Sequence, residues 1–462
     1  MKVAVVGGGI AGSSVAIYLG NLGIDITLFE KKSSLVDGPP MCHLHAGGNL
    51  YPDISINQCI QLLKESIDLI KLYPQAIDYR PTIIAIPTYD DNEPQDLLKK
   101  LQTLQKEYEK LVNLDASNKL LGEPKDYFKI FSKEDLLKIR DSSDYYEWIT
   151  PFAKEVDLEK LKYPVFLVQE YGLNVFRVAA SATILLNRLQ NVTLNLNTEV
   201  IDVKKDDKFK IKYKKDGKEF IEEFDYLINA AGFESGKIDD AIGIKRDRFL
   251  EFKAAYVTKW DEDRYKWPEI IFYGKRGTSK GMRQFTPYYG NYFQIHTMTK
   301  DVTLFDKGLA KNPKNSSYPK LDDDFLNRVY QGWKWSEVED RTNRSIVYIS
   351  DFIKNFNGAK VASKPLYGIQ QIPGDDESLR AAEVSFDGDS YARCEIVKAS
   401  SVLAMAKSIL LKIENRDGIK LGNIDDISLD KFKLDKKDVD KMAPYIAINR
   451  GYPAEMGYLY TN

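Results

Sequence analysis

The chain has 462 residues, with 66 Lys and Arg against 68 Asp and Glu. The net charge of −2 gives no basic field, so we expect neither nucleic acid nor an anionic membrane as a partner. No apolar run approaches the roughly 18 residues that a membrane span needs. We expect no signal peptide, because the first apolar stretch is the nucleotide-type strand itself. The three cysteines form no Cys-x-x-Cys pair. We therefore expect a cytoplasmic protein without a metal site.

The first residues have the pattern of a strand, a turn and a helix. The β-branched run 3–6 leads directly into Gly7-x-Gly9-x-x-Gly12. Gly7 would make the tight turn, Gly9 would let a pyrophosphate approach the backbone, and Gly12 would let the helix pack close to the strand. The helix N-terminus offers N–H groups and a positive dipole end to phosphates. The pattern predicts a dinucleotide site.

A second apolar run, 24–29, ends on Glu30 and is followed by Lys31. A carboxylate at this point can accept hydrogen bonds from both ribose hydroxyls, and it would repel a 2′-phosphate. Glu30 therefore argues against NADP at this site. FAD and NAD both remain open from this pattern alone.

The remaining patterns predict elements along the whole chain. They are a helix at 55–72, a strand at 77–87, a mostly helical insertion at 92–160, a strand at 164–170, a helix at 175–189, strands at 192–203 and a hairpin at 207–224. Short antiparallel strands follow at 250–300, then helices at 320–357, a loop and strand at 361–389, a helix at 397–413 and a turn-rich end.

The nucleotide-type segments are interrupted by substrate-type segments, so we predict an α/β fold with two discontinuous domains. A Rossmann-like nucleotide domain would take residues 1–80, 171–240 and 361–462. A second, α+β substrate domain on a mostly antiparallel sheet would take residues 81–170 and 241–360.

Three further segments carry a resemblance: the run 195–200, the turn 227–232 and the loop 42–51. With the βαβ unit, they resemble the FAD-dependent oxidoreductases of the D-amino-acid oxidase/glycerol-3-phosphate dehydrogenase superfamily. The resemblance implies that Val200 brackets the adenine through its backbone and that Ala231 and Gly232 lie beside the dinucleotide.

The loop His45-Ala46-Gly47-Gly48-Asn49-Leu50 lies between two family variants. Glycerol-3-phosphate dehydrogenases carry a His-Gly-Gly-Leu-Arg-Tyr run there, and dimethylglycine and sarcosine dehydrogenases carry Trp-His-Ala-Ala-Gly-Leu. Gly47 and Gly48 allow the backbone to lie flat against a planar ring. The resemblance implies that His43 and His45 face the flavin's reactive edge, and that His45 is the candidate for covalent attachment. Alternatively, both histidines only bond the loop backbone.

The segment 385–395 precedes a helix, and flavoproteins of this type return there to the flavin pyrimidine edge. Gly388, Arg393 and Cys394 are the candidates for that contact, where a helix dipole would stabilise negative charge. The alternative is a hairpin turn that feeds a packed helix.

The substrate candidates come mainly from the antiparallel section. Arg283 with Tyr288 and Tyr289, or Arg80, could hold a substrate carboxylate through paired hydrogen bonds. His296 is a candidate base. Aromatic strand residues more often pack a core, which is the competing interpretation.

The leading hypothesis is an FAD-dependent oxidoreductase that oxidises a CH–N or CH–OH bond of a small substrate by hydride transfer to flavin N5. The substrate would be an amino acid, an N-methyl amine or a hydroxy acid, with amines slightly favoured by the His-Ala-x-Gly match. An unidentified acceptor, such as oxygen or a quinone, would reoxidise the flavin. The alternatives are an NAD-dependent dehydrogenase and a flavin-less binding or escort protein of the same fold. The 230–232 turn favours FAD, and the intact glycines speak against an escort.

Overall fold

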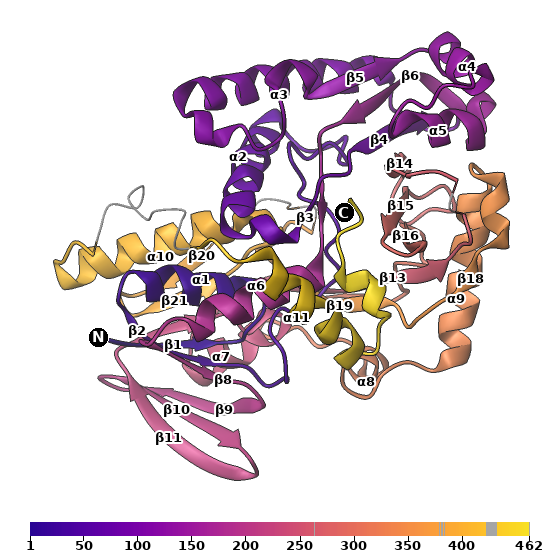
Figure 1. Cartoon of the computed structure of the whole chain (residues 1–462). Helices are drawn as coiled ribbons and strands as arrows, with labels where there is room; N and C mark the ends of the chain where they lie inside the picture. Colours follow the sequence, from indigo (N-terminus) through magenta and orange to yellow (C-terminus); the bar gives the residue numbers. More distant parts are fainter. Residues whose placement is uncertain (263, 378, 380–381, 383, 422–431, 462) are drawn as a thin grey trace.

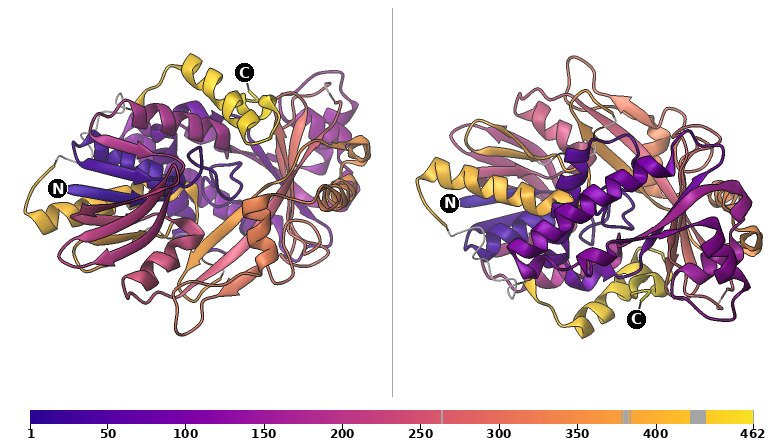
Figure 2. Two further views of the ribbon diagram at one scale, coloured as in Figure 1. Left: turned by 90° about the horizontal axis from the view of Figure 1, so that it is seen from below. Right: turned by 90° about the horizontal axis from the view of Figure 1, so that it is seen from above.

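The computed structural model describes residues 1–262, 264–377, 379, 382, 384–421 and 432–461. A six-stranded sheet lies at one end of the molecule, and its neighbouring strands are parallel except for one edge pair (Figures 1 and 2). Across the sheet the strands are β20 (Val384–Asp387), β21 (Tyr391–Cys394), β12 (Tyr226–Asn229), β1 (Lys2–Val6), β2 (Asp25–Phe29) and β8 (Val192–Asn195).

The central strand β1 is apolar throughout because both of its faces are buried. Val3 and Val5 pack with the helices, whereas Ala4 and Val6 pack with a separate three-stranded sheet. That small sheet consists of β9 (Thr198–Lys205), β10 (Phe209–Lys215) and β11 (Lys218–Phe224). Helix α7 (Ser235–Ala241) follows β12 in the chain and precedes β13 of the second sheet.

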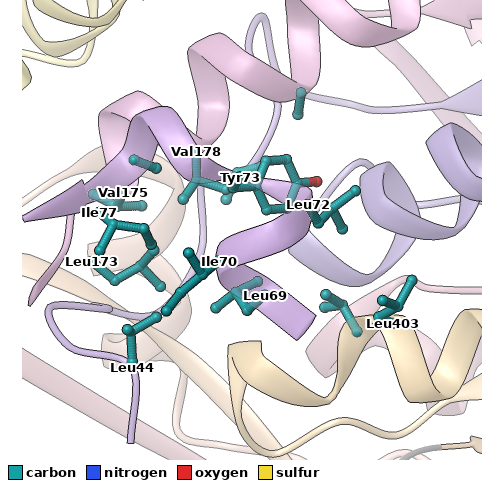
Figure 3. Packing of buried hydrophobic residues seen from close by; sticks show 14 of the residues in the cluster. Leu44, Leu69, Ile70, Leu72, Tyr73, Ile77, Leu173, Val175, Val178 and Leu403 are labelled. Carbon is teal, nitrogen blue, oxygen red and sulfur yellow. The ribbon is translucent and has the colours of Figure 1, made fainter. Parts of the chain in front are cut away.

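Helices cover the other face of the first sheet. In Figure 3 the end of one of them, α2, is held by apolar side chains of α6 and α10, and Leu44 from the loop before His45 joins this packing. The helices are α1 (Ile10–Asn21), α2 (Ile56–Leu72), α6 (Val175–Asn187), α10 (Val402–Asp417) and α11 (Lys436–Asn449).

The second sheet has ten strands, and only its β14–β4 pair is parallel. The strands of its main path are, in order, β17 (Leu309–Lys311), β13 (Arg248–Lys259), β16 (Tyr292–Thr297), β15 (Arg283–Tyr288), β14 (Glu269–Phe272), β4 (Thr82–Pro87), β6 (Leu161–Val168) and β5 (Phe128–Phe131). Two more strands, β18 (Lys360–Val361) and β19 (Leu366–Pro373), pair with β13. A two-stranded ladder joins β3 (Ile77–Asp78) to β7 (Gly172–Leu173). The predicted Rossmann-like domain and mostly antiparallel second sheet are confirmed.

The helical insertion extends away from the first sheet (Figure 1). The insertion contains α3 (Pro94–Leu114), α4 (Lys133–Asp141) and α5 (Ile149–Glu155). Two further helices, α8 (Asp323–Gln331) and α9 (Trp335–Ser350), follow β17 in the chain. The insertion also supplies the edge strand β5, which the sequence does not predict. No helix in the described ranges is long and apolar enough to cross a membrane.

The turn-rich end predicted for the last fifty residues is wrong over residues 436–449, which form α11. Pro444 lies inside this helix and conceals it from sequence reading, because proline normally breaks a helix interior. Gly457 packs its backbone against the helix at Pro444, where an added Cβ would lie 2.4 Å from the proline nitrogen.

A buried carboxylate joins the two sheets. Asp239 of α7 accepts a hydrogen bond from the Tyr391 hydroxyl at 2.6 Å and one from Arg393 Nε at 2.8 Å. It also pairs with Arg248 of β13. All four side chains are almost inaccessible to solvent.

We expect Asp239→Ala to lower the free energy of unfolding by about 3–5 kcal/mol, because it leaves two buried arginines without their shared counter-ion. Urea unfolding followed by tryptophan fluorescence measures this loss. Asp340→Ala, which breaks an exposed pair with Arg344, is the control and should change the value by no more than about 0.5 kcal/mol. Equal losses in the two variants would contradict the assignment.

Candidate functional site

A cavity of about 1520 Å³ lies between the carboxyl ends of the first sheet's strands and one face of the second sheet. Its wall includes Glu30 and Ala231 on one side and Gln284 and His296 on the other. Ligand pockets are usually about 300–1,000 Å³. The volume therefore has room for a dinucleotide and a second small molecule.

The glycine turn has the geometry that close approach requires. Gly7 has a φ of +103°, and an added Cβ would lie 2.3 Å from the Ala230 carbonyl oxygen. Gly12 packs against the turn, where a Cβ would lie 1.9 Å from the Gly7 oxygen. Gly9 instead lines the cavity with no atom within 4 Å of the Cβ position, and it begins α1 without a side-chain cap. The uncapped helix end fits a pyrophosphate.

Glu30 stands at the end of β2 in the cavity wall. Its two oxygens accept hydrogen bonds from the backbone N–H groups of Gly8 and Lys32, both at 2.7 Å. Burial raises the pKa of Glu30, although the two amides and the Lys32 charge act in the opposite direction. Each oxygen keeps a further lone pair, which fits a ribose hydroxyl donor.

The other predicted cofactor contacts meet around the same end of the cavity. Val200 of β9, Ala231 and Gly232 all line it. Lys31 lines it too, but its ammonium group is paired with Glu234 and lies 4.7 Å from the centre of the Tyr330 ring. Lys31 therefore closes the rim of the site.

His43 and His45 occupy the middle of the cavity wall and are hydrogen-bonded to each other, with 3.1 Å between His43 Nε2 and His45 Nδ1. Gly47 and Gly48 do not line the cavity. An added Cβ at Gly47 would meet Leu104 of α3 at 2.7 Å, and one at Gly48 would meet Ile54, just before α2, at 2.6 Å and Leu62 of α2 at 3.1 Å. Both glycines have positive φ, so they shape the turn that presents His45.

A buried ion-pair network lies behind His43. Glu269, at the start of β14, pairs with Arg80, and its other oxygen lies 3.2 Å from His43 Nδ1 and 2.6 Å from the Gln284 amide nitrogen. Arg80 also donates to the Cys42 carbonyl oxygen at 2.9 Å. Arg80 thus holds a carboxylate of the protein, and not of a substrate as the sequence analysis expects.

The charges in this network stabilise one another. Burial disfavours the ionised form of Glu269, but Arg80 and His43 outweigh it and bring its pKa to about 2. Burial also opposes charge on His43, but Cys42 and Glu269 raise its pKa well above the ordinary value. Cys42, His43 and Glu269 lie close enough to share a metal ion. Both Glu269 oxygens are already hydrogen-bonded, so we assign an ion-pair network.

Glu170 is a second buried carboxyl group next to the histidines. Ring nitrogens of His43 and His45 and an oxygen of Glu170 all lie within 4.8 Å of one another. Burial raises the pKa of Glu170 to about 7, and the charge of His43 opposes the shift. Sequence reasoning missed Glu170 and Glu269. The available signal was an acid next to an apolar strand, at the start of the strand for Glu269 and just after the strand for Glu170.

The predicted substrate residues separate into two groups. His296 lines the cavity, but burial and the charge of His43 lower its pKa to about 3, so it is a weak base. Arg283 lies on the opposite face of β15 from Gln284, because side chains alternate along a strand. It bonds Tyr348 and Asp351 of the α9 segment.

Tyr288 and Tyr289, the two tyrosines predicted to bind substrate, do not line the cavity either. Tyr288 is buried away from the cavity and its hydroxyl donates to Gln294 at 3.0 Å. Tyr289 is 45% exposed and packs against Tyr458.

Of the residues predicted to meet the flavin near the C-terminus, Gly388 and Arg393 do not line the cavity. Gly388 lies in the turn between β20 and β21, and the Arg393 guanidinium donates hydrogen bonds to Asp239 and Ser385. Cys394 does line the cavity, together with residues 396–399. The backbone enters a short 3-10 turn at Ala399 and then α10, so a helix starts directly after these cavity-lining residues.

The end of α11 forms the last part of the wall. Arg450 lines the cavity and donates to Ser34 Oγ at 3.0 Å and to the Val36 carbonyl oxygen at 3.2 Å. Tyr452 lines it as well and bonds the Pro365 carbonyl oxygen at 2.8 Å. The Arg450 contacts fix the loop that follows Glu30, and the Tyr452 contact holds the segment before β19.

Comparison with known proteins identifies the family. The family model of the FAD-dependent oxidoreductases called DAO matches residues 2–301. The chain belongs to this family. It is therefore an FAD-dependent oxidoreductase, as the sequence analysis predicts, and the nicotinamide and flavin-less alternatives are set aside.

No curated protein matches the chain by sequence. Similar solved structures include glycine oxidase from Geobacillus kaustophilus, with 12% identity, coverage of 91% of this chain and 95% of that one, and a TM-score of 0.58. L-proline dehydrogenase from P. horikoshii has 14% identity, 98% coverage of both chains and a TM-score of 0.56. Glycerol-3-phosphate dehydrogenase from Bacillus halodurans, complexed with FAD, has 12% identity, 99% and 81% coverage, and a TM-score of 0.57. These likenesses show a shared fold.

We expect Gly9→Val to lower the bound flavin per protein by more than about tenfold. The φ of Gly9 is −62°, which valine adopts readily, so the new side chain would only fill the space assigned to the pyrophosphate. Visible absorbance of the purified protein measures the flavin. Gly358→Val, at an exposed turn outside the cavity, is the control. Full flavin in Gly9→Val would refute the assignment.

We expect Glu170→Gln to reduce the loss of stability as the pH rises. A carboxyl group whose folded pKa is raised from 4.5 to about 7 stabilises the fold fully below pH 4.5, and this contribution is lost as the pH rises through about 7. The difference corresponds to at most about 3 kcal/mol. Melting temperatures at pH 5 and pH 8 measure it, with the exposed Glu109→Gln as control. The same pH dependence in both variants would contradict the buried, protonated state.

Proposed function

We propose that this oxidoreductase oxidises a CH–N or CH–OH bond in a small substrate that carries an anionic group. The observation that carries the proposal is the continuous cavity, which joins the glycine turn to a second region walled by His45, Gln284 and His296. Bound FAD would supply the hydride acceptor for the reaction. Gly9, Glu30, Val200 and the 230–232 turn would hold its adenosine and phosphates.

The second region of the cavity favours an anion. Lys253, Lys275, Arg276 and Lys398 all line it. Lys253 and Arg276 both pair with Glu251, which partly neutralises these two charges, so an anion is favoured mainly by Lys275 and Lys398. The similar solved structures carry the names of a glycine oxidase, a proline dehydrogenase and a glycerol-3-phosphate dehydrogenase, whose substrates share a small size and an anionic group. Amines remain slightly favoured by the loop sequence at His45.

The reaction needs a group that binds or moves a proton next to the oxidised carbon. His45 is the best placed side chain because it lines the cavity and is supported from behind by His43. His296 would contribute by position and shape, since its low pKa keeps it neutral.

The test is anaerobic bleaching of the bound flavin by a panel of glycine, proline, N-methylglycine, lactate, glycolate and glycerol 3-phosphate. At least one anionic substrate should bleach the visible band, and a panel that leaves it unchanged would overturn the proposal. We expect His45→Asn to keep the flavin but slow bleaching by about 10²-fold or more. Asparagine tolerates the left-handed backbone of this position. Lys307→Asn, at an exposed residue with a similar φ of +61°, is the matched control.

A further inference from the structure

Gln284 brings a polar side chain to the cavity from the middle of the second sheet. It lies on β15 directly between Ile271 of β14 and His296 of β16, and it lines the cavity although it is only 2% exposed. A primary amide carries two N–H donors and an oxygen that accepts. Because buried polar groups need partners, we ask where each end of this amide finds its own.

The nitrogen end of the Gln284 amide finds its partners inside the protein. Nε2 lies 2.6 Å from a carboxylate oxygen of Glu269 and 3.1 Å from Thr286 Oγ1. Cys42 Sγ and His43 Nδ1 lie around the same nitrogen, at 3.0 and 3.1 Å. Glu269 and Thr286 alone can accept both N–H hydrogens, whichever proton His43 carries. The nitrogen end therefore has no donor left for the cavity.

Glu269 decides which end of the amide is the nitrogen. The two ends of a side-chain amide have the same shape, so their order follows from their partners. Glu269 is paired with the buried guanidinium of Arg80, which keeps the carboxylate ionised and able only to accept. An amide oxygen at 2.6 Å would bring two oxygens together without a proton between them, whereas an N–H there makes a charge-assisted hydrogen bond. The nitrogen of Gln284 therefore faces Glu269.

The oxygen end of the amide is left for the cavity. Within the ranges that the structure describes, every hydrogen bond of the Gln284 side chain is made by its nitrogen, and its oxygen accepts none. This oxygen is also not among the described polar atoms that are buried without a partner, so it is open to the cavity that Gln284 lines. An amide oxygen has lone pairs and no proton, so the group that it meets must be a donor.

We propose that Gln284 selects the substrate by a hydrogen bond from the substrate's N–H or O–H, next to the oxidised carbon, to the amide oxygen. Glu269 and Thr286 are positioning residues, because they hold the nitrogen end and so aim the oxygen. The site would take amines and alcohols that keep this hydrogen and disfavour those in which a methyl group replaces it. The inference deepens the function proposed above and rests on it for what occupies the cavity.

Two ligand pairs that differ by one methyl group measure this selection in the FAD-loaded protein. N,N-dimethylglycine and trimethylglycine carry the same charges at neutral pH, but only the first has an N–H. Glycolate has an O–H that methoxyacetate lacks. Dissociation constants come from the change in the visible flavin spectrum, recorded anaerobically before any reduction. We expect the donor of at least one pair to bind about tenfold or more tightly than its methylated partner, because the partner leaves a buried acceptor unpaired.

Gln284→Met separates the hydrogen bond from the size of the added methyl group. Methionine has a similar length but only a weak acceptor, so the preference for the donor should fall to about threefold or less. Gln294→Met makes the same change at a buried residue of β16 outside the cavity, and it should keep the wild-type preference. If Gln284→Met does not fold, Gln284→Asn replaces it, because the shorter side chain withdraws the oxygen and should lower the preference in the same direction.

An equal preference in the wild type and the Gln284 variant, or the failure of both donors to bind, would overturn the proposal. Loss of flavin from the Gln284 variant with an unchanged preference would mean that the oxygen bonds FAD itself, and would overturn it as well. The proposed function fails separately, because binding needs no turnover. A preference that depends on Gln284 without any bleaching substrate would defeat the proposed function alone, and bleaching without such a preference would defeat this inference alone.

Discussion

The pairing of Arg80 with Glu269 is the interaction on which the wall of the cavity depends. Both side chains are almost completely buried, and each would be strongly disfavoured there without the other. The pair joins three distant parts of the chain, because Arg80 follows β3, Glu269 begins β14, and the Cys42 carbonyl oxygen accepts from Arg80. The loop that carries His43 and His45 is thereby fixed to the second sheet.

The two sheets therefore line different ends of the cavity. The first sheet ends in the glycine turn and Glu30, which suit the adenosine and phosphates of FAD. The second sheet supplies Gln284 and His296, which face the other end of the cavity. The histidine loop crosses from one half to the other. Small changes in the buried pair would therefore alter the chemistry without touching the dinucleotide end.

The nucleotide end was readable from sequence because its signals are local. Gly7, Gly9, Gly12 and Glu30 lie within one βαβ unit, and each has a role set by its immediate neighbours. The second half was not readable in the same way. Arg283 carries the right chemistry, but its face of β15 is decided by the strand's register, which a sequence of aromatic residues does not reveal.

The buried acids show a related difficulty. Glu269 finds Arg80 across 189 positions of the chain, and only the parallel pairing of β14 with β4 brings them together. The prediction that Gly388 and Arg393 contact the flavin has a simpler weakness, because a glycine turn before a helix is a common pattern. Residues 396–399, which follow β21, line the cavity instead.

The contacts of Arg450 and Tyr452 have a consequence for how the holoenzyme is made. The glycine turn is synthesised before the wall opposite the loop at 34–36, which follows more than 400 residues later. Until residue 452 has been synthesised and docked, the cavity lacks one side. A complete cavity therefore requires the docking of α11 as well as the Rossmann-like sheet.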